Sequence, residues 1–234
     1  MTPALDARLA AAAALCRPGQ PVADIGCDHG KLAAHLACTG LYPKVIGADL
    51  RPGPLAKAAL TVKSARCEDL VQLRLGDGLT VIDPYEVGTV VLAGVSAQTT
   101  IEILTAAPWV FTADGPRLVL VPATKHATLR SWLYANGFAL VEDQPVQAAG
   151  RWYAVMAAEY TGVRQPEQMQ TLEQCLYGLT DRHAGGEEYA ALQRGKLQKL
   201  RRGLADDDPL AVCIDAHLAA AHEAGLACEL PRKN

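Results

Sequence analysis

This 234-residue sequence has few aromatic residues, little excess charge of either sign and no long hydrophobic run. The net charge is only −3 at pH 7, so the whole-chain charge does not indicate nucleic-acid binding. No apolar run approaches the ~18 residues of a membrane-spanning helix. The seven cysteines form no Cys-x-x-Cys pair, which argues against a disulfide framework or a zinc site. We therefore expect a cytoplasmic protein with no membrane segment, no metal and no obligate protein partner.

Hydrophobic residues make up 50% of the chain, enough for a sizeable core. Short apolar runs alternate with helical patterns along the first two thirds of the sequence. Because alternating strands and helices are typical of parallel βαβ units, we predict an α/β fold with a mostly parallel sheet. Two further runs, around a turn at Ala148-Ala149-Gly150, predict a closing antiparallel pair. The predicted strands are 21–25, 44–49, 71–75, 89–93, 117–121, 138–146 and 152–160.

The chain changes character after a linker at 161–166, because no strand pattern follows it. Helical patterns cover 167–179, 187–204 and 209–225. The sequence therefore predicts two domains, a sheet domain at 1–162 and a C-terminal helical domain at 163–234. Because the sheet looks complete without the second domain, we expect residues 1–165 to fold on their own.

The stretch from Pro21 to Gly30 predicts a strand, a tight glycine turn and the start of a helix. Such a turn lets a ligand approach the backbone at Gly26. Asp24 and Asp28 flank this turn, and their carboxylates would repel a phosphate. They suit a ligand that carries a cation, such as the amino or sulfonium group of S-adenosylmethionine.

Two further acids follow the next strands of the predicted sheet. Ligands of open parallel sheets bind beyond the carboxyl ends of the strands. Asp49 lies where an acid accepts hydrogen bonds from ribose hydroxyls, and Asp77 could accept the exocyclic amine of adenine, with Leu50 and Leu79 enclosing the ring. Any one of these acids could simply cap a loop, but the ordered set predicts a nucleoside cofactor. A nicotinamide dinucleotide is disfavoured, because its pyrophosphate prefers the pattern Gly-x-Gly-x-x-Gly.

The chain resembles class I methyltransferases, and more narrowly the bacterial tRNA (adenine(22)-N1)-methyltransferase family of the TrmK type. The resemblance covers nearly the whole sequence, and Asp28-His29 is its most specific element. It implies a Rossmann-like sheet with an antiparallel closing strand and a C-terminal helical appendage. It also implies S-adenosyl-L-methionine as cofactor and tRNA as partner. The matching stretches are 8–9, 24–29, 76–79, 130–133, 150–153 and 177–178.

The motifs and the resemblance together give candidate site residues. Asp28 is the catalytic candidate, because a carboxylate near the exocyclic amine would stabilise the positive charge of an adenine methylated at N1. The acceptor-side candidates are Arg8, Ser96 and Pro122. The predicted cofactor-binding residues are Asp24, Gly26, Asp28, His29, Asp49, Leu50, Gly76, Asp77, Gly78, Leu79, Ala93 and Gly94.

The chain has one basic cluster, on a helical pattern of the C-terminal domain. Arg194 and Lys199 of this cluster are candidates for contact with RNA phosphates, although a solvated helix would have the same pattern. His217 and His222 also lie in this domain and are expected to be solvated.

Two loops depart from the family pattern. Gly94-Val95-Ser96-Ala97 stands where the family has Gly-Met-Gly-Gly, and Val121-Pro122-Ala123 stands where it has Gln-Pro-Asn. We expect strain at 96–97, because glycine reaches backbone angles that other residues avoid. The main hypothesis is therefore an adenosylmethionine-dependent tRNA methyltransferase. The alternatives are a weakened paralogue that binds adenosylmethionine or RNA, or a methyltransferase with a different acceptor.

Overall fold

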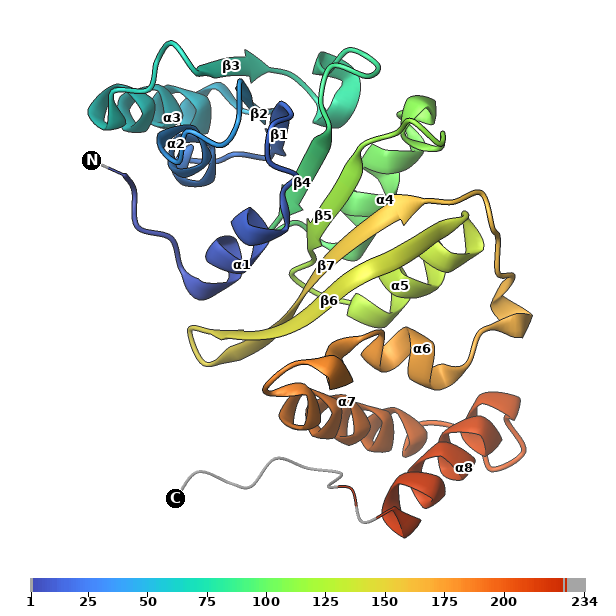
Figure 1. Cartoon of the computed structure of the whole chain (residues 1–234). Coiled ribbons are helices and arrows are strands. Elements are labelled where there is room, and N and C mark those ends of the chain that lie inside the picture. Colours follow the sequence, from blue (N-terminus) through green and yellow to red (C-terminus); the bar gives the residue numbers. More distant parts are fainter. Residues whose placement is uncertain (1, 225, 227–234) are drawn as a thin grey trace.

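The computed structural model describes residues 2–224 and 226, and its strands form a seven-stranded mixed sheet in the order β3-β2-β1-β4-β5-β7-β6 (Figure 1). All strands run parallel except β7, which pairs antiparallel with both β5 and β6. This arrangement confirms the predicted Rossmann-like sheet with an antiparallel closing strand. The strands are β1 (Val22–Ile25), β2 (Val45–Asp49), β3 (Val71–Leu75), β4 (Thr89–Ala93), β5 (Arg117–Val121), β6 (Phe138–Ala148) and β7 (Arg151–Tyr160).

Helices cover both faces of the sheet. Residues of α1, α2 and α3 pack against one face, and residues of α4 and α5 pack against the other. The α-helices are α1 (Ala7–Leu15), α2 (Lys31–Cys38), α3 (Pro52–Ala65), α4 (Ala97–Thr105), α5 (His126–Ala135), α6 (Leu172–Tyr177), α7 (Gly186–Arg201) and α8 (Pro209–Glu223). Four 3₁₀ turns join them in the described chain, namely η1 (Gly78–Val81), η2 (Pro108–Val110), η3 (Glu167–Met169) and η4 (Thr180–Arg182).

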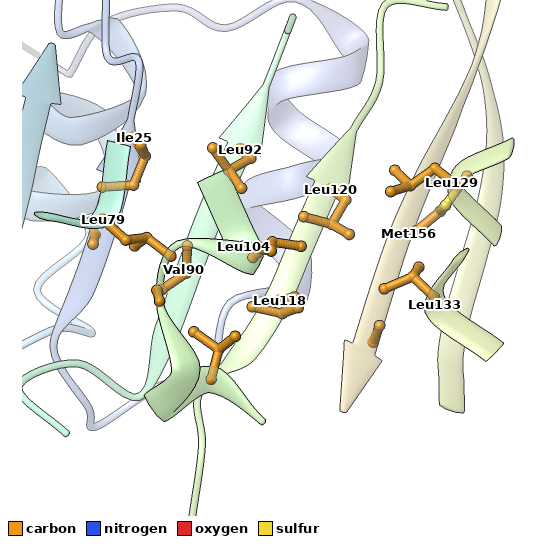
Figure 2. Close-up of a cluster of buried hydrophobic side chains, with 14 of the residues drawn as sticks. Ile25, Leu79, Val90, Leu92, Leu104, Leu118, Leu120, Leu129, Leu133 and Met156 are labelled. Carbon is orange, nitrogen blue, oxygen red and sulfur yellow. The ribbon is translucent and has the colours of Figure 1, made fainter. Parts of the chain in front are cut away.

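The central strands are buried on both faces, which explains their continuous apolar runs. Alternate residues along each strand therefore enter two separate cores. Leu92 of β4 and Leu120 of β5 point toward Leu104 of α4 in one of them (Figure 2). Val91 and Val119 enter the other core, beneath α1–α3. This packing fixes the carboxyl ends of β1, β2 and β4 side by side.

The hairpin of β6 and β7 reaches beyond the carboxyl end of β5. The last pair between β5 and β7 is Leu120 with Met156, whereas the β6–β7 ladder continues to Ala148 and Arg151. α1 lies against this projecting part of the hairpin, and the two come from distant parts of the sequence (Figure 1). The start of the chain thereby becomes a neighbour of the sheet edge at which ligands bind.

The C-terminal helices pack against α5 and β6 rather than standing apart (Figure 1). One continuous helix over 167–179 was predicted, and that prediction is wrong. Thr171 starts a new helix there through a capping box with Gln174, so η3 and α6 are separate. The predicted end of the last helix at position 225 lies outside the described residues, as do 227–234. The domain boundary at 162/163 stays a prediction.

Within the described residues, no helix has both the length and the apolar composition to cross a membrane. The same residues contain no group of three or more His, Cys, Asp or Glu side chains arranged to hold a metal ion.

Candidate functional site

A cleft of about 700 Å³ lies at the carboxyl ends of the central strands. All four acids that the sequence singled out line it, although they come from three different strand ends. Asp24 belongs to β1, Asp28 follows β1, Asp49 ends β2 and Asp77 follows β3. The parallel sheet brings them together because the carboxyl ends of its strands share one edge.

The loop after β1 has an unusual backbone. Gly26 has a φ of +73°, and Asp28 has a φ of +48°, which is uncommon for a residue with a side chain. The backbone N–H of Asp28 donates to Oδ2 of Asp49 at 3.1 Å, and the N–H of Arg51 donates to Oδ1 at 2.9 Å. The buried carboxylate of Asp49 therefore ties the loops after β1 and β2 together. It offsets the strain at Asp28, which costs on the order of 1–3 kcal/mol.

Asp24 is buried at the floor of the cleft, and its Oδ2 accepts no hydrogen bond from any described residue. Burial raises the pKa of this carboxyl to about 7, with a smaller contribution from the nearby charge of Asp49 and an opposing one from the backbone N–H of Ala33. An unsatisfied buried oxygen of this kind costs free energy unless a ligand pairs with it. A cationic group placed in the cleft would stabilise the ionised form. The residues present therefore fit a ligand with an ammonium group and a ribose.

A backbone hydrogen bond joins the loops after β4 and β5, which were predicted from the sequence to lie on the acceptor side. The N–H of Ala123 donates to the carbonyl of Val95 at 2.8 Å. Gly94 has a φ of +88°, so the conformation that demands glycine is kept at that position. Ser96 has an ordinary extended backbone and caps α4, accepting from the N–H of Thr99 at 3.1 Å. The strain expected at 96–97 is therefore absent at Ser96, and that expectation is wrong.

Most predicted site residues lie in the lining of the cleft. Leu50 is on its rim with 62% of its surface exposed. The predicted residues found in the lining are Arg8, Asp24, Gly26, Asp28, His29, Asp49, Leu50, Gly76, Asp77, Gly78, Ala93 and Gly94.

Three predicted residues near the sheet are not in the lining. Leu79 packs in the core beside Ile25 and Val90 instead of enclosing a ligand (Figure 2). Pro122 is buried, and Ser96 acts as the helix cap. The reason for Leu79 is that η1 begins at Gly78 and turns its side chain inward under the sheet edge.

The basic cluster on α7 does not form a phosphate-binding surface around Arg194. That side chain is 2% exposed and forms an ion pair with Glu187. Arg201 pairs with Asp206 at 2.7 Å and with Asp215 at 2.9 Å. Lys199 is exposed but lies outside the cleft. Assigning Arg194 to RNA contact is therefore wrong, because α7 turns this residue toward the protein.

His217 was expected to be solvated, but it is half-buried, and its Nε2 lies 2.7 Å from the hydroxyl of Tyr177. His222 is exposed as expected.

The sequence reasoning missed several residues of the lining. Arg51 follows Asp49 by two positions, and its Nε lies 3.7 Å from that carboxylate. Lys31 opens α2 and also faces the cleft. Ile103 of α4 lies close against Gly78, on the side where Leu79 was expected. A charged residue directly after a strand could have indicated Arg51 as a site residue. An apolar helix position such as Ile103 gives no such indication in the sequence.

Comparisons with known proteins agree with this geometry. A family model described as a methyltransferase domain matches residues 5–156. The tRNA (adenine(22)-N(1))-methyltransferase of Bacillus subtilis (strain 168) is 30% identical over 155 residues, which is 66% of this chain. The chain spans 65% of that relative's own length, slightly less than two thirds.

Solved structures share the fold over almost the entire chain. The B. subtilis M1A22 tRNA methyltransferase TrmK has a TM-score of 0.75 at 24% identity, over 94% of this chain and 96% of that one. M. capricolum TrmK, solved with S-adenosyl-homocysteine, has a TM-score of 0.75 at 17% identity, with coverages of 94% and 97%. A Streptococcus pneumoniae protein solved with S-adenosyl-L-methionine has a TM-score of 0.77 at 23% identity, with coverages of 92% and 98%.

The resemblance to methyltransferases inferred from the sequence is confirmed. The family model covers well over half of the chain, and the sheet order and the cleft agree with it. This protein belongs to the methyltransferase domain family.

Proposed function

We propose that this chain is an S-adenosyl-L-methionine-dependent methyltransferase that acts on tRNA in the cytoplasm and methylates N1 of an adenine. The observation that carries the proposal is the convergence of four carboxylates in one cleft, with a buried oxygen of Asp24 left unpaired. The curated relative from Bacillus subtilis supports the choice of tRNA and of adenine N1.

Each acid has a distinct role toward the cofactor. Asp24 pairs with the ammonium group, because Oδ2 of its buried carboxylate accepts no hydrogen bond from the described residues. Asp49 accepts from the ribose hydroxyls, since each of its oxygens accepts only one backbone N–H and has a lone pair left. Asp77 accepts from the adenine amine, and Leu50 and Ile103 enclose the ring. The remaining contacts with the cofactor come from His29 and from the backbone of small residues, namely Gly26, Gly76, Gly78, Ala93 and Gly94.

The bound cofactor supplies an electrophilic methyl group on a sulfonium. The protein's main task is to align N1 of the acceptor adenine with that methyl group, which is catalysis by proximity. N1 lies on the Watson–Crick edge, so a paired base must first be unstacked and turned into the cleft. The N1 lone pair would form the new bond as the bond between the methyl group and sulfur breaks. The positive charge would thereby pass from the sulfonium, which leaves as a neutral thioether, to the adenine ring. The carboxylate of Asp28, which is 62% exposed toward the mouth of the cleft, stabilises that charge.

The test is transfer of a radiolabelled methyl group from S-adenosylmethionine to bulk bacterial tRNA, followed by nucleoside identification. We expect N1-methyladenosine. Asp28→Asn keeps the shape of the side chain but removes its charge, so it should slow single turnover by about tenfold or more. Asp114→Asn is the matched control, because Asp114 is an exposed acid shortly before β5, at the edge of the sheet away from the cleft. A wild-type protein that binds the cofactor but labels no RNA would overturn the proposal.

A non-catalytic paralogue is not favoured. That alternative depended on damage to the acceptor loops, whereas Gly94 keeps its left-handed backbone and Ser96 caps α4 in an ordinary conformation. The backbone at Gly94 and Ser96 therefore gives no reason to expect a damaged acceptor side.

A further inference from the structure

Arg8 is held at the edge of the cleft by two neighbours. Its Cζ lies over the ring of Tyr153, 5.3 Å from the ring centroid. Its Nε donates to Oδ2 of Asp6 at 3.0 Å, and Oδ1 of the same carboxylate accepts from the N–H of Leu9 at 3.0 Å. Asp6 therefore caps α1 and orients the guanidinium of Arg8 at the same time.

The pair lies on the acceptor side of the cleft. Tyr153 stands on the part of the β6–β7 hairpin that extends past β5. A Cβ added to Gly94, after β4, would lie 3.7 Å from Nη1 of Arg8. The acids that suit the cofactor lie on the other side, after β1, β2 and β3. Arg8 thus stands between the end of β4 and the hairpin.

Arg8 also retains free binding capacity. Its two terminal nitrogens donate no hydrogen bond to residues 2–224 or 226, and its side chain is 28% exposed. A guanidinium presents a flat face to a base and donors to its edge. Stacking of bases on arginine and aromatic side chains is a common way to hold an unpaired nucleotide. The planar guanidinium of Arg8, which lies over the ring of Tyr153, is therefore preorganised to stack on such a base.

We propose that Arg8, oriented by Tyr153 and Asp6, receives the flipped purine of the acceptor nucleotide. This inference rests on the proposed function and deepens it. Arg8 makes the contact, whereas Tyr153 and Asp6 are positioning residues that act through it. α1, the first helix of the chain, thereby completes the acceptor half of the site.

Four variants at three positions separate the parts of this arrangement. Arg8→Lys keeps the charge but removes the planar face. Tyr153→Phe keeps the ring under Arg8, whereas Tyr153→Leu removes it. Asp6→Asn releases Arg8 without touching the core and keeps a good helix cap. Arg17→Lys is the control, because Arg17 follows α1 but pairs with Glu159 away from the cleft.

Two readouts are measured with the full chain. The first is the single-turnover rate of methyl transfer to tRNA. The second is the binding of adenosine monophosphate in the presence of S-adenosylhomocysteine, detected by saturation-transfer NMR. We expect Arg8→Lys and Tyr153→Leu to lose at least tenfold in rate and to lose the nucleotide signal. Asp6→Asn should lose a few-fold, while Tyr153→Phe should retain most of both. The cofactor dissociation constant should stay within twofold of the wild type in all variants.

Distinct results overturn the inference and the proposed function. If Arg8→Lys weakens cofactor binding as much as it slows transfer, Arg8 binds the cofactor's carboxylate and the inference is wrong. Unchanged transfer and nucleotide binding in both Arg8→Lys and Asp6→Asn also overturn it, and these two variants do not depend on core packing at Tyr153. If adenosine monophosphate binds through Arg8 and Tyr153 but tRNA is not methylated, the proposed function fails, and only the assignment of Arg8 to purine binding stands.

Discussion

The guanidinium of Arg130 on α5 and the carboxylate of Asp143 on β6 form a fully buried, bidentate ion pair, with nitrogen–oxygen distances of 2.7 and 3.2 Å. Arg130 also donates to the carbonyls of Cys175 and Leu176, at 3.2 and 2.7 Å, and to the hydroxyl of Tyr189 at 3.3 Å. The sheet and the C-terminal helices therefore share one buried hydrogen-bond network.

Breaking this pair should destabilise the whole protein. Asp143→Asn leaves the buried charge of Arg130 uncompensated, and removing one partner of a buried pair costs about 3–5 kcal/mol. Urea denaturation measures the change in the free energy of unfolding. Asp206→Asn is the control, because Asp206 is 96% exposed and its pair with Arg201 should contribute less than about 1 kcal/mol. Equal losses in the two variants would contradict the network's importance.

Truncation should depend on where the chain is cut. Removal of residues 166–234 takes away Tyr189 and the two carbonyls that satisfy Arg130, so the remaining sheet domain should unfold at a much lower temperature or aggregate. This reverses the expectation from sequence that residues 1–165 fold on their own. Removal of residues 209–234 spares the network and should leave cooperative unfolding intact.

Calorimetric thermal unfolding compares the two truncations with the full chain. A fragment 1–165 that melts cooperatively near the temperature of the full protein would restore the original expectation. In that case the contacts of Arg130 with the C-terminal helices would add little to the stability of the sheet.

Asp49→Ala should weaken cofactor binding strongly. The substitution removes the ribose contact and also releases the N–H groups of Asp28 and Arg51, which the carboxylate now holds. Loss of a charged hydrogen bond costs about 2 kcal/mol, or roughly 30-fold in the dissociation constant. Titration calorimetry with S-adenosylmethionine measures the dissociation constant. Asp69→Ala is the control, because Asp69 lies on the exposed surface. Unchanged affinity in Asp49→Ala would remove this residue from the site.

Cofactor affinity should rise with pH through Asp24. Burial raises its pKa to about 7, so the ionised fraction grows roughly tenfold or more between pH 5.5 and 7. A cationic group on the ligand prefers that ionised form. Asp24→Asn should bind weakly and lose this pH dependence. His29→Gln should keep it, which separates Asp24 from the exposed imidazole at the cleft mouth.

The same shift determines how stability depends on pH without ligand. Asp24 has a pKa of about 7 in the folded protein and an ordinary value of 3.8, so the folded state holds a proton that the unfolded state loses between these values. The contribution of Asp24 to the free energy of unfolding therefore falls as the pH rises from about 4 to 7 and is constant above pH 7. Asp24→Asn should be more stable than the wild type at pH 8. The opposite order in urea denaturation at pH 8 would show that the Asp24 carboxylate has a stabilising partner besides the backbone N–H of Ala33.

Much of the fold and the cofactor side of the cleft could be predicted from the sequence. Strands buried on both faces read as apolar runs, and helix and turn residues separate them, so the order of elements follows from local pattern. Parallel strands bring their carboxyl ends to one edge of the sheet, and this alone predicts that Asp24, Asp49 and Asp77 lie close together.

Tertiary structure decided what depends on the direction of a side chain or on pairing between distant segments. The inward turn of η1 buries Leu79 and leaves Ile103 at the cleft, and the packing of α7 buries Arg194. The local sequence pattern alone would allow both Leu79 and Arg194 to contact a ligand. The contact of Arg8 with Tyr153 spans most of the sheet domain, and that of Arg130 with Leu176 joins it to the helices. Such contacts depend on how whole elements pack, because neighbouring residues in the sequence carry no information about a partner that only the fold brings near.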